Sequence, residues 1–209
     1  MKKGKFITLE GGEGVGKSTN LQFIQQYLQN CGADVCLTRE PGGTPLAERI
    51  RSLLLDHGEE SVTPEAELLL VFAARAQHLQ HFILPRLRQG QWILCDRFTD
   101  ATYAYQGGGR QMDTGCIAWL ENTVQGDLRP DITLLLDAPV EIGMQRAQKR
   151  GELDRFESER QDFFERVRNS YLQQAQANPQ RYRIIDASRP LLEVQAQISE
   201  ILDNLLKQV

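Results

Sequence analysis

Apolar residues are concentrated in five short runs that alternate with longer segments of helical periodicity. Runs in which most side chains are apolar are typical of strands in a parallel sheet that helices cover on both faces. Breakers such as Gly32, Pro130 and Pro139 lie beside these runs and separate them from the neighbouring segments. The pattern therefore predicts strands at residues 5–9, 34–38, 92–95, 132–136 and 182–185.

Between these runs, apolar residues recur every three or four positions. Leu21, Ile24 and Leu28, for example, share one helical face. Strands that alternate with helices indicate an α/β fold of three layers, in which a five-stranded parallel sheet lies between helices. No interdomain linker interrupts the pattern, so we expect a single domain over residues 1–209. The predicted helices are residues 17–30, 46–55, 65–88, 140–149, 155–177 and 191–206.

The composition is that of an ordinary globular protein. Hydrophobic residues make up 41% and charged residues 25%, and 24 basic against 28 acidic residues give a net charge of −4. This acidic excess argues against a protein that wraps long nucleic acid. The longest apolar stretch, residues 68–74, is far shorter than the roughly 20 residues that cross a bilayer, and the N-terminus lacks the pattern of a signal peptide. We therefore expect a cytoplasmic protein with no membrane or nucleic-acid partner.

Cysteine and histidine show no spacing typical of a metal site. The four cysteines form no C-x2-C pair and are expected to be buried thiols. His78 and His81 lie three residues apart on a predicted helix, without a third ligand nearby, and we expect them on the helix surface.

A phosphate-binding motif follows the first predicted strand. Residues 11–18 read GGEGVGKS and match G-x-x-x-x-G-K-[ST] between a strand and a helix, the context that the motif requires. Glycines allow backbone N–H groups to surround phosphate oxygens, and the N-terminus of the following helix adds its positive dipole. Lys17 would bring a charge to the β and γ phosphates of ATP, and Ser18 would bind Mg²⁺. The predicted ATP-binding residues of the loop are Gly11, Gly12, Glu13, Gly14, Val15, Gly16, Lys17, Ser18 and Thr19.

The phosphate loop alone does not separate kinases from switch GTPases. The GTPase strings D-x-x-G and N-K-x-D do not occur in the chain, which removes most of the support for a switch protein. Asp96 and Arg97 directly follow the strand predicted at residues 92–95, at the edge where parallel α/β sheets bind ligands. Arg97 can contact a phosphate through two N–H groups, and Asp96 can support Mg²⁺ directly or through water. A surface ion pair is the alternative interpretation of these two residues.

Three further motifs give the chain a specific family resemblance. They are TREPGGT at residues 38–44, DRF at residues 96–98 and AYQGGGR at residues 104–110. Together with the phosphate loop, and in the same order and spacing, they resemble the bacterial thymidylate kinase family over essentially the whole chain. The resemblance implies Mg²⁺-dependent transfer of a phosphoryl group from ATP to dTMP, which gives dTDP on the route to dTTP. It also implies a homodimer.

The same resemblance assigns residues to the phosphate and the sugar of dTMP. It places Arg51 and Arg97 on the phosphate and Glu13 near the sugar 3′-hydroxyl. Each guanidinium can make charge-assisted hydrogen bonds to a phosphate dianion, and a carboxylate accepts well from a hydroxyl. Tyr105 would pack against the deoxyribose and leave little room for a 2′-hydroxyl.

For the base, the resemblance implies that Arg75 donates to the thymine 4-oxo group, where cytosine presents an amine, and that Thr102 and Gln106 contact the ring. One position departs from the family pattern. In many relatives the aromatic residue that stacks on thymine lies four residues before this arginine, whereas here that position is Val71, and Phe72 follows it. Either Phe72 stacks on the base from a shifted angle, or Val71 forms an aliphatic floor with Phe72 in the core.

A basic segment at about residues 146–157 resembles a small lid. Arg146 and Arg150 share one helix face, where their like charges repel unless an anion such as an ATP phosphate lies between them. The resemblance is to the bacterial type, in which a basic lid supplies a catalytic charge, here from Arg150 or Arg155. No general base is needed, because the attacking phosphate oxygen is already ionised near neutral pH. The predicted catalytic residues are Lys17, Arg97, Arg150 and Arg155.

Two other functions stay open at this point. Another nucleoside monophosphate kinase would share the phosphate loop and prefer a different base. A nucleotide-binding regulatory or assembly protein would hydrolyse ATP slowly without an acceptor, but Arg51, Arg75 and Arg97 have no obvious role in such a protein.

Overall fold

A five-stranded parallel sheet forms the centre of the molecule. The computed structural model describes residues 4–56, 60–149 and 154–207. The strands lie in the order β2-β3-β1-β4-β5, and every neighbouring pair is parallel. All five strands expected from the apolar runs are confirmed, with ends that shift by one or two residues. Their bounds are β1 (Phe6–Gly11), β2 (Val35–Arg39), β3 (Trp92–Asp96), β4 (Ile132–Asp137) and β5 (Tyr182–Asp186).

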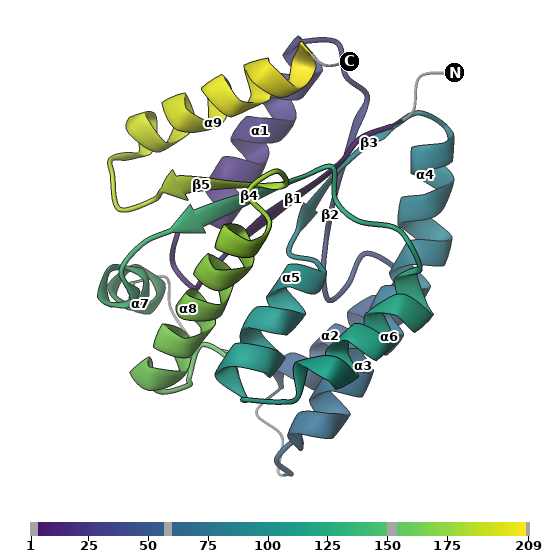
Figure 1. Ribbon diagram of the computed structural model, residues 1–209, viewed down its shortest axis with the longest axis vertical. Coiled ribbons are helices and arrows are strands. Elements are labelled where there is room, and N and C mark those ends of the chain that lie inside the picture. Colours follow the sequence, from purple (N-terminus) through teal and green to yellow (C-terminus); the bar gives the residue numbers. More distant parts are fainter. Residues whose placement is uncertain (1–3, 57–59, 150–153, 208–209) are drawn as a thin grey trace.

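Helices cover both faces of this sheet (Figure 1). They are α1 (Lys17–Asn30), α2 (Pro45–Leu55), α3 (Pro64–His78), α4 (Leu84–Arg88), α5 (Thr99–Thr102), α6 (Thr114–Gln125), α7 (Val140–Gln148), α8 (Gln161–Ala177) and α9 (Leu191–Leu206), with π-helical turns η1 (Leu79–Ile83) and η2 (Tyr103–Gly109). Helices α1 and α9 contact each other on one face, while α4, α5 and α8 pack on the other. Helix α3 lies farther from the sheet, in contact with α2 and α6. The three-layer α/β prediction is confirmed.

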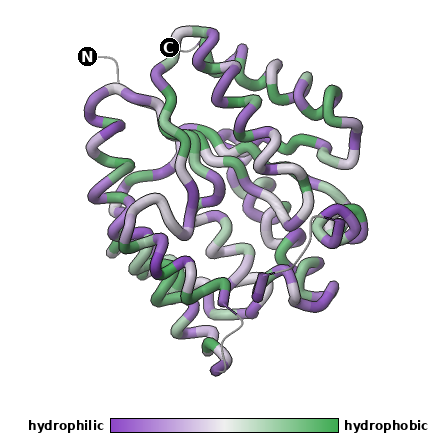
Figure 2. Tube along the Cα trace, turned by 180° about the vertical axis from the view of Figure 1, so that it is seen from behind, coloured by the Kyte–Doolittle hydropathy of each residue, from purple (hydrophilic) through white to green (hydrophobic). Residues whose placement is uncertain are grey.

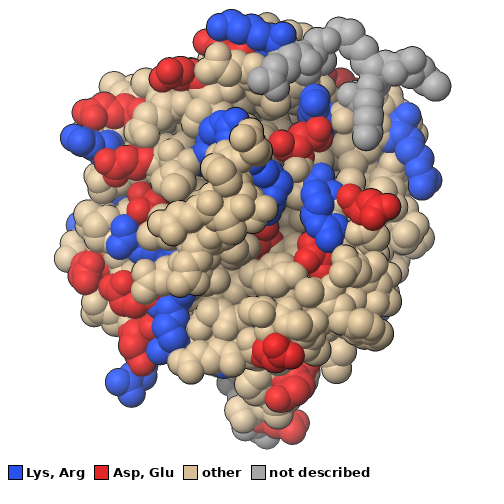
Figure 3. Space-filling model, viewed as in Figure 1, with Lys and Arg blue, Asp and Glu red and all other residues tan. Residues whose placement is uncertain are grey.

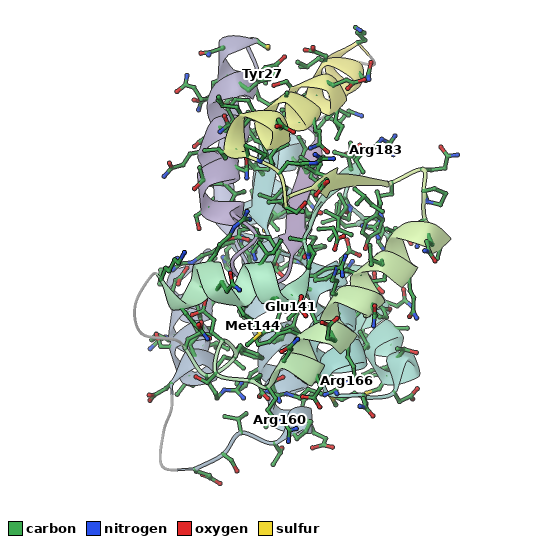
Figure 4. The ribbon with its side chains drawn as sticks, turned by 90° about the vertical axis from the view of Figure 1, so that its left-hand side faces the viewer. Tyr27, Glu141, Met144, Arg160, Arg166 and Arg183 are labelled. Atoms are coloured by element: carbon green, nitrogen blue, oxygen red, sulfur yellow. The ribbon has the colours of Figure 1, made fainter. Side chains whose placement is uncertain are left out.

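The largest apolar core lies between the sheet and the pair formed by α1 and α9. Leu134 of β4, Ile24 of α1 and Ile198 of α9 belong to it, and all three are fully buried. Where the two helices meet, the Tyr27 hydroxyl donates to Asp203 at 2.6 Å (Figure 4). In Figure 2 green segments lie where the strands run together, and the helices around them alternate between green and purple along their length. Burial of these apolar side chains holds the strands in a fixed register.

This register aligns the carboxyl ends of the strands. Leu9 of β1 and Arg39 of β2 both pair with Asp96 of β3. On the other side of β1, Gly11 pairs with Leu136 of β4. The segments that follow β1, β2 and β3 therefore leave the sheet side by side, at the edge where ligands of parallel α/β sheets bind.

Two differences from the predicted helices concern the middle of the chain. The helix expected at residues 65–88 is divided into α3, η1 and α4, because Pro85 at the start of α4 cannot donate a backbone hydrogen bond and the preceding turn widens. The helices α5, η2 and α6 were not predicted. A Cβ at Gly109 would lie 2.4 Å from the Phe163 ring, so the close packing of η2 on α8 requires glycine there. Glycine adds nothing to an apolar helical pattern, and the pattern therefore did not predict η2.

A third difference concerns the segment before α8. The helix expected at residues 155–177 begins only at Gln161. The Asp154 carboxylate accepts from the backbone N–H groups of Phe156 and Glu157, both at 2.9 Å. This local turn competes with helix formation, as acceptor side chains near a chain reversal commonly do.

The prediction of buried thiols is wrong for Cys31 and Cys116, which are exposed, whereas Cys95 is buried. Among the helices of the described ranges, none has the length and apolar character needed to cross a membrane.

The phosphate loop packs directly against α7. A Cβ at Gly14 would lie 1.9 Å from the carbonyl oxygen of Gly143, and a Cβ at Gly143 would lie 2.3 Å from that of Glu13. Gly14 also has a φ of 69°, a conformation that favours glycine. Met144, the next residue of α7, packs toward α8 on the opposite side (Figure 4). The two backbones touch at this point, so a side chain on either one would separate the loop from α7.

We expect Gly143→Ala to lower the free energy of unfolding by about 1–3 kcal/mol, because the added methyl group overlaps the Glu13 carbonyl. Helix propensity alone has the opposite sign, since Ala is about 1 kcal/mol more favourable than Gly in a helix. Urea denaturation of both proteins measures the difference. Gly115→Ala in α6, where the nearest atoms belong to the Asp113 carboxylate, is the control and should be neutral or stabilising. A gain in stability for Gly143→Ala would show that this backbone contact does not exist.

Candidate active site

A cavity of about 690 Å³ opens at the carboxyl edge of the sheet. Its wall combines the phosphate loop with the segments that follow β2 and β3 and with parts of α2, α3, η2 and α7. Cavities of roughly 300–1,000 Å³ are typical of small-molecule sites. The wall includes these residues expected from the sequence: Glu13, Gly14, Gly16, Lys17, Ser18, Thr19, Arg51, Arg75, Asp96, Arg97, Thr102, Tyr105, Gln106 and Arg146.

The phosphate loop forms the end of the cavity next to α1. Gly16 has a φ of 91° at the start of α1, and no side chain of the described residues caps that helix. The first-turn N–H groups and the positive end of the helix dipole can therefore bind an anion. The Lys17 ammonium donates to the carbonyl oxygens of Gly11 at 3.2 Å and Gly12 at 2.7 Å, which holds it across the loop. Burial lowers the pKa of Lys17, and the positive charge of Arg97 acts in the same direction.

Three loop residues that were expected to bind ATP lie behind the loop. Gly11, Gly12 and Val15 line a small space between the loop, β4 and α7, and they are not part of the cavity wall. Val15 is 5% exposed and belongs to the main apolar core. These three residues therefore support the loop from the side away from the cavity. They could contact a phosphate only through their backbone N–H groups.

Arg97 lies beside the phosphate loop, directly after β3. Its φ of 66° is in the left-handed region and turns the chain sharply. The guanidinium donates to the Glu13 carboxylate and lies 4.6 Å from the centre of the Tyr105 ring. The Tyr105 hydroxyl donates to the same carboxylate oxygen at 2.7 Å. Burial alone would lower the pKa of Arg97, but Glu13 and the other oxygen groups around it raise that pKa well above its usual range.

Arg51 of α2 lies close enough to Arg97 to be affected by its charge. It donates to the carbonyl oxygen of Pro41 at 3.0 Å. Burial lowers the pKa of Arg51, and the positive charges of Arg39 and Arg97 add to this effect. Two guanidinium groups that repel each other on one cavity wall favour an anion between them.

A buried carboxylate that was not predicted supports this part of the wall. Glu10 of β1 accepts from the Phe98 backbone N–H at 2.7 Å and from the Tyr171 hydroxyl at 2.8 Å. The Tyr171 hydroxyl in turn accepts from Arg97 at 3.4 Å. Burial and the charge of Asp100 raise the pKa of Glu10 to about 8. The sequence did contain a signal for Glu10, because it is the single acidic residue of the apolar strand β1. A buried carboxylate requires hydrogen-bond partners, so such a residue indicates a polar network.

Arg75 is the most deeply buried charged residue of the cavity wall, with an exposed fraction of 1%. Its Nε donates to Glu40 at 2.8 Å, and its Nη2 donates to the Thr102 hydroxyl at 3.0 Å. Its Nη1 has no hydrogen-bond partner within the part of the chain that the structure describes. Because the other donors fix the plane of the guanidinium, Nη1 is a preoriented donor for a ligand.

Glu40, which is also part of the cavity wall, accepts from Arg75, and His78 behind the wall contacts Glu40 in turn. Burial opposes ionisation of Glu40, yet Arg75 and His78 together hold its pKa below the usual value. The His78 ring nitrogens lie 2.9 Å from the Glu40 carboxylate and 2.7 Å from the Thr38 hydroxyl. The expectation that His78 lies on the helix surface is therefore wrong. It is fully buried, because both ring nitrogens have partners inside the protein.

The structure decides between the two alternatives for Val71 and Phe72. Val71 is part of the cavity wall and Phe72 is not. Phe72 is 2% exposed and packs with Ile117, because α6 covers that flank of α3. The assignment of Phe72 to the base is corrected accordingly, and its ring instead lies 4.7 Å from the Arg75 guanidinium. Phe98, which was not predicted, lines the cavity and lies 5.2 Å from the same guanidinium.

The three arginines expected in the lid have different positions. Arg146 lines the cavity and donates to a backbone carbonyl just after β5 at 2.8 Å. Arg155 is not part of the cavity wall, because it donates to the Leu54 carbonyl oxygen and to the Glu67 carboxylate, both at 2.7 Å. Arg150 lies outside the described residues.

Two oxygen donors beside the loop fit a divalent cation. Asp96 ends β3, and its buried Oδ1 has no hydrogen-bond partner among the residues described. Ser18, in the first turn of α1, lies on the same cavity wall. Carboxylate and hydroxyl oxygens are the ligand type that Mg²⁺ prefers.

Comparison with known proteins identifies the family of the chain. The family model described as thymidylate kinase matches residues 9–198. A thymidylate kinase from Pseudomonas savastanoi pv. phaseolicola is 60% identical over 204 residues, which cover 98% of this chain and 97% of that protein. One from Ectopseudomonas mendocina is 61% identical with the same coverage. The crystal structure of thymidylate kinase from Ehrlichia chaffeensis matches with a TM-score of 0.78 at 33% identity and covers 96% of this chain and 99% of its own. The chain belongs to the thymidylate kinase family.

Proposed function

We propose that this protein transfers the γ-phosphoryl group of ATP to dTMP and forms ADP and dTDP on the route to dTTP. The observation that carries this proposal is one cavity whose wall holds both the phosphate loop and the arginine pair Arg51 and Arg97. An anion-binding loop and an arginine pair on the wall of one cavity fit two phosphate groups that meet head to head. Membership of the family supports the same reaction.

In this proposal the protein contributes position and charge. The loop amides, Lys17 and Thr19 would surround the ATP phosphates, with Arg146 at the side of the nucleotide. Arg51 and Arg97 would hold the phosphate of dTMP in line with the transferred group. Because the attacking oxygen is already ionised, no side chain has to remove a proton.

Mg²⁺ is part of the proposal, with the Ser18 hydroxyl and the Asp96 carboxylate as its protein partners, directly or through water. When bound, the ion would neutralise charge on the ATP phosphates. The buried Oδ1 of Asp96, which lacks a hydrogen-bond partner among the described residues, supports this assignment.

Selection of the base would depend on Arg75. Its Nη1 would donate to the thymine 4-oxo group, and a cytosine amine at that place would leave two donors facing each other, at a cost of about 1–3 kcal/mol. Thr102 accepts from Arg75, so it would act mainly by orienting the guanidinium. Gln106 would contact the ring, and Val71 would form the floor beneath it.

Selection of the sugar would depend on Glu13 and Tyr105. The hydrogen bond between them holds the Tyr105 ring beside Arg97. A ring held in this position would exclude a 2′-hydroxyl, and the Glu13 carboxylate would accept from the 3′-hydroxyl.

The lid arginines Arg150 and Arg155 would supply charge to the transferred group. For Arg155 this requires a movement, because its guanidinium is bonded to Glu67 and Leu54 in the structure. The movement would bring the segment that includes residues 154–157, parts of which already line the cavity, closer to the phosphate loop.

A cytoplasmic homodimer without membrane or nucleic-acid partners completes the proposal. Leu53 of α2, Leu69 of α3 and Trp119 of α6 are 61%, 58% and 65% exposed, and α3 contacts both other helices. An exposed apolar surface of this kind favours association with a second copy. On the face seen in Figure 3, Lys and Arg are interspersed with Asp and Glu, which does not favour nucleic acid.

Addition of dTMP should accelerate ADP formation from ATP in a coupled assay.

Arg97→Ala should lower kcat/KM for dTMP by about 100-fold or more, because a charged contact to the transferring phosphate is lost. Arg189→Ala, at a residue with a 61% exposed side chain, is the matched control and should be close to wild type. Equal ADP release with and without dTMP would favour a protein that hydrolyses ATP without an acceptor, and a preference for purine monophosphates would contradict the assignment of Arg75.

Arg155→Ala should lower kcat by about 10–100-fold and leave KM for dTMP nearly unchanged, because the charge acts only when the lid is closed. Steady-state kinetics with varied dTMP separate the two parameters. Arg160→Ala removes an arginine of the same segment whose side chain is 90% exposed, and its kcat should not change. An unchanged kcat in Arg155→Ala would remove this residue from the mechanism.

Val71→Ala and Phe72→Leu should affect different properties. Val71→Ala should raise KM for dTMP by about 3–10-fold through lost contact with the base, and because Val71 is also buried it should lose some stability, so KM is the parameter that separates the two variants. Phe72→Leu should lower the free energy of unfolding by about 1–2 kcal/mol and leave KM unchanged, because the ring packs in the core. Kinetics and urea denaturation of both variants check this, and the reverse result would place Phe72 against the base.

A further inference from the structure

Glu67 of α3 is a fully buried carboxylate whose one part in the mechanism above is to hold Arg155 before that residue moves. It lies four residues before Val71 and eight before Arg75, so the three side chains share one flank of the helix. Val71 and Arg75 line the cavity, whereas Glu67 lies behind its wall and can act on a ligand only through another side chain. A buried charge without a partner is unfavourable, so the groups that donate to Glu67 indicate what it does.

Three side chains donate to this carboxylate. Its Oε1 accepts from Gln106 Nε2 at 2.8 Å and from Arg110 Nε at 3.3 Å. Its Oε2 accepts from Arg155 Nη2 at 2.7 Å and from Arg110 Nη2 at 3.2 Å. Arg110 and Arg155 fill both carboxylate oxygens with hydrogen bonds from charged donors, and a carboxylate paired in this way acts as an acceptor.

This restriction determines how the Gln106 amide is oriented. The group that faces an acceptor-only carboxylate must be the NH₂ group, so the carbonyl oxygen of the amide points elsewhere. Gln106 is 3% exposed and forms part of the cavity wall, as Arg75 and Thr102 do. An amide held in this way offers the cavity an acceptor rather than a donor.

We propose that Glu67 is a positioning residue that fixes the Gln106 amide so that its carbonyl oxygen accepts from the N3–H of a thymine or uracil ring. This inference rests on the proposed phosphorylation of dTMP. Thymine and uracil present a donor at N3 beside an acceptor at O4, which complements the Gln106 oxygen and Arg75 Nη1. Cytosine presents the reverse pattern, with an acceptor at N3 and a donor amine on C4. A freely rotating amide could turn its NH₂ group toward the N3 of cytosine, and Glu67 prevents that rotation.

The test compares dUMP with dCMP as acceptors for wild type and Glu67→Gln, because these two nucleotides differ only at N3 and C4. A neutral amide at residue 67 can accept or donate, so the orientation of Gln106 is no longer fixed. We expect the ratio of kcat/KM for dUMP to that for dCMP to fall by about tenfold. A purely structural role, or an effect through Arg155, would change both acceptors equally and leave the ratio unchanged, which would overturn the proposal.

Glu159→Gln is the matched control. Glu159 is the other carboxylate partner of Arg110, and among the bonds described it makes none to Gln106. The change is chemically identical to Glu67→Gln and weakens the same arginine network, so the ratio should stay at the wild-type value. A similar fall in both variants would mean that the arginine network sets the ratio, and it would contradict a role that acts through Gln106.

A second measurement decides the matter if Glu67→Gln does not fold. Dissociation constants of dTMP and N3-methyl-dTMP are measured for wild type and for Gln106→Met. Methylation should weaken binding by at least about tenfold more in wild type than in Gln106→Met, because only wild type loses an acceptor for N3–H. Equal losses would overturn the proposal. Wild-type protein that phosphorylates neither dTMP nor dUMP would overturn the proposed function itself, whereas active wild type with an unchanged ratio would overturn only the role of Glu67.

Discussion

Arg75 and Arg97, two arginines of the cavity wall, each depend on a carboxylate partner. A guanidinium that leaves water loses hydration, and only an opposite charge with well-placed hydrogen bonds compensates for this loss. Glu13 serves Arg97, and Glu40 serves Arg75. The same hydrogen bonds that make burial tolerable also fix the orientation of each guanidinium. The donors that are not used in these pairs therefore have defined positions, and they are what a phosphate or a base would meet.

The parallel sheet makes these pairs possible because it aligns the ends of its strands. Glu13 follows β1, Glu40 follows β2 and Arg97 follows β3, and the register places all three segments at one edge. Arg75 reaches the same region from α3, which does not contact the sheet closely but lies between α2 and α6. The end of the cavity at the phosphate loop is thus built on the sheet, whereas the end at Arg75 is built on helices. In the proposed reaction, selectivity for the base would depend on α3 and η2, and η2 also contacts the phosphate loop through the hydrogen bond from Tyr105 to Glu13.

The sequence predicted what depends on local pattern. The strands and the phosphate loop follow from apolar runs and a motif whose spacing has a direct structural meaning. Contacts between distant segments were not predictable in this way: Glu67 and Gln106 are 39 residues apart and meet only after folding. Val71 and Phe72 are adjacent and both buried, so periodicity could not separate them, and the packing of α6 against Phe72 left Val71 as the one that lines the cavity. Helical periodicity also failed where η2 packs closely on α8, because glycines carry no apolar signal there.

The central claim is that two anionic nucleotides meet head to head in this cavity, one at the backbone amides of the loop and the other at guanidinium groups. A crystal structure of the protein with ADP and dTMP tests this most directly. The account predicts the ADP phosphates within the phosphate loop, the dTMP phosphate between Arg51 and Arg97, and the thymine 4-oxo group within hydrogen-bond distance of Arg75 Nη1. A dTMP molecule bound elsewhere, or bound in the cavity with its phosphate away from Arg97, would contradict it.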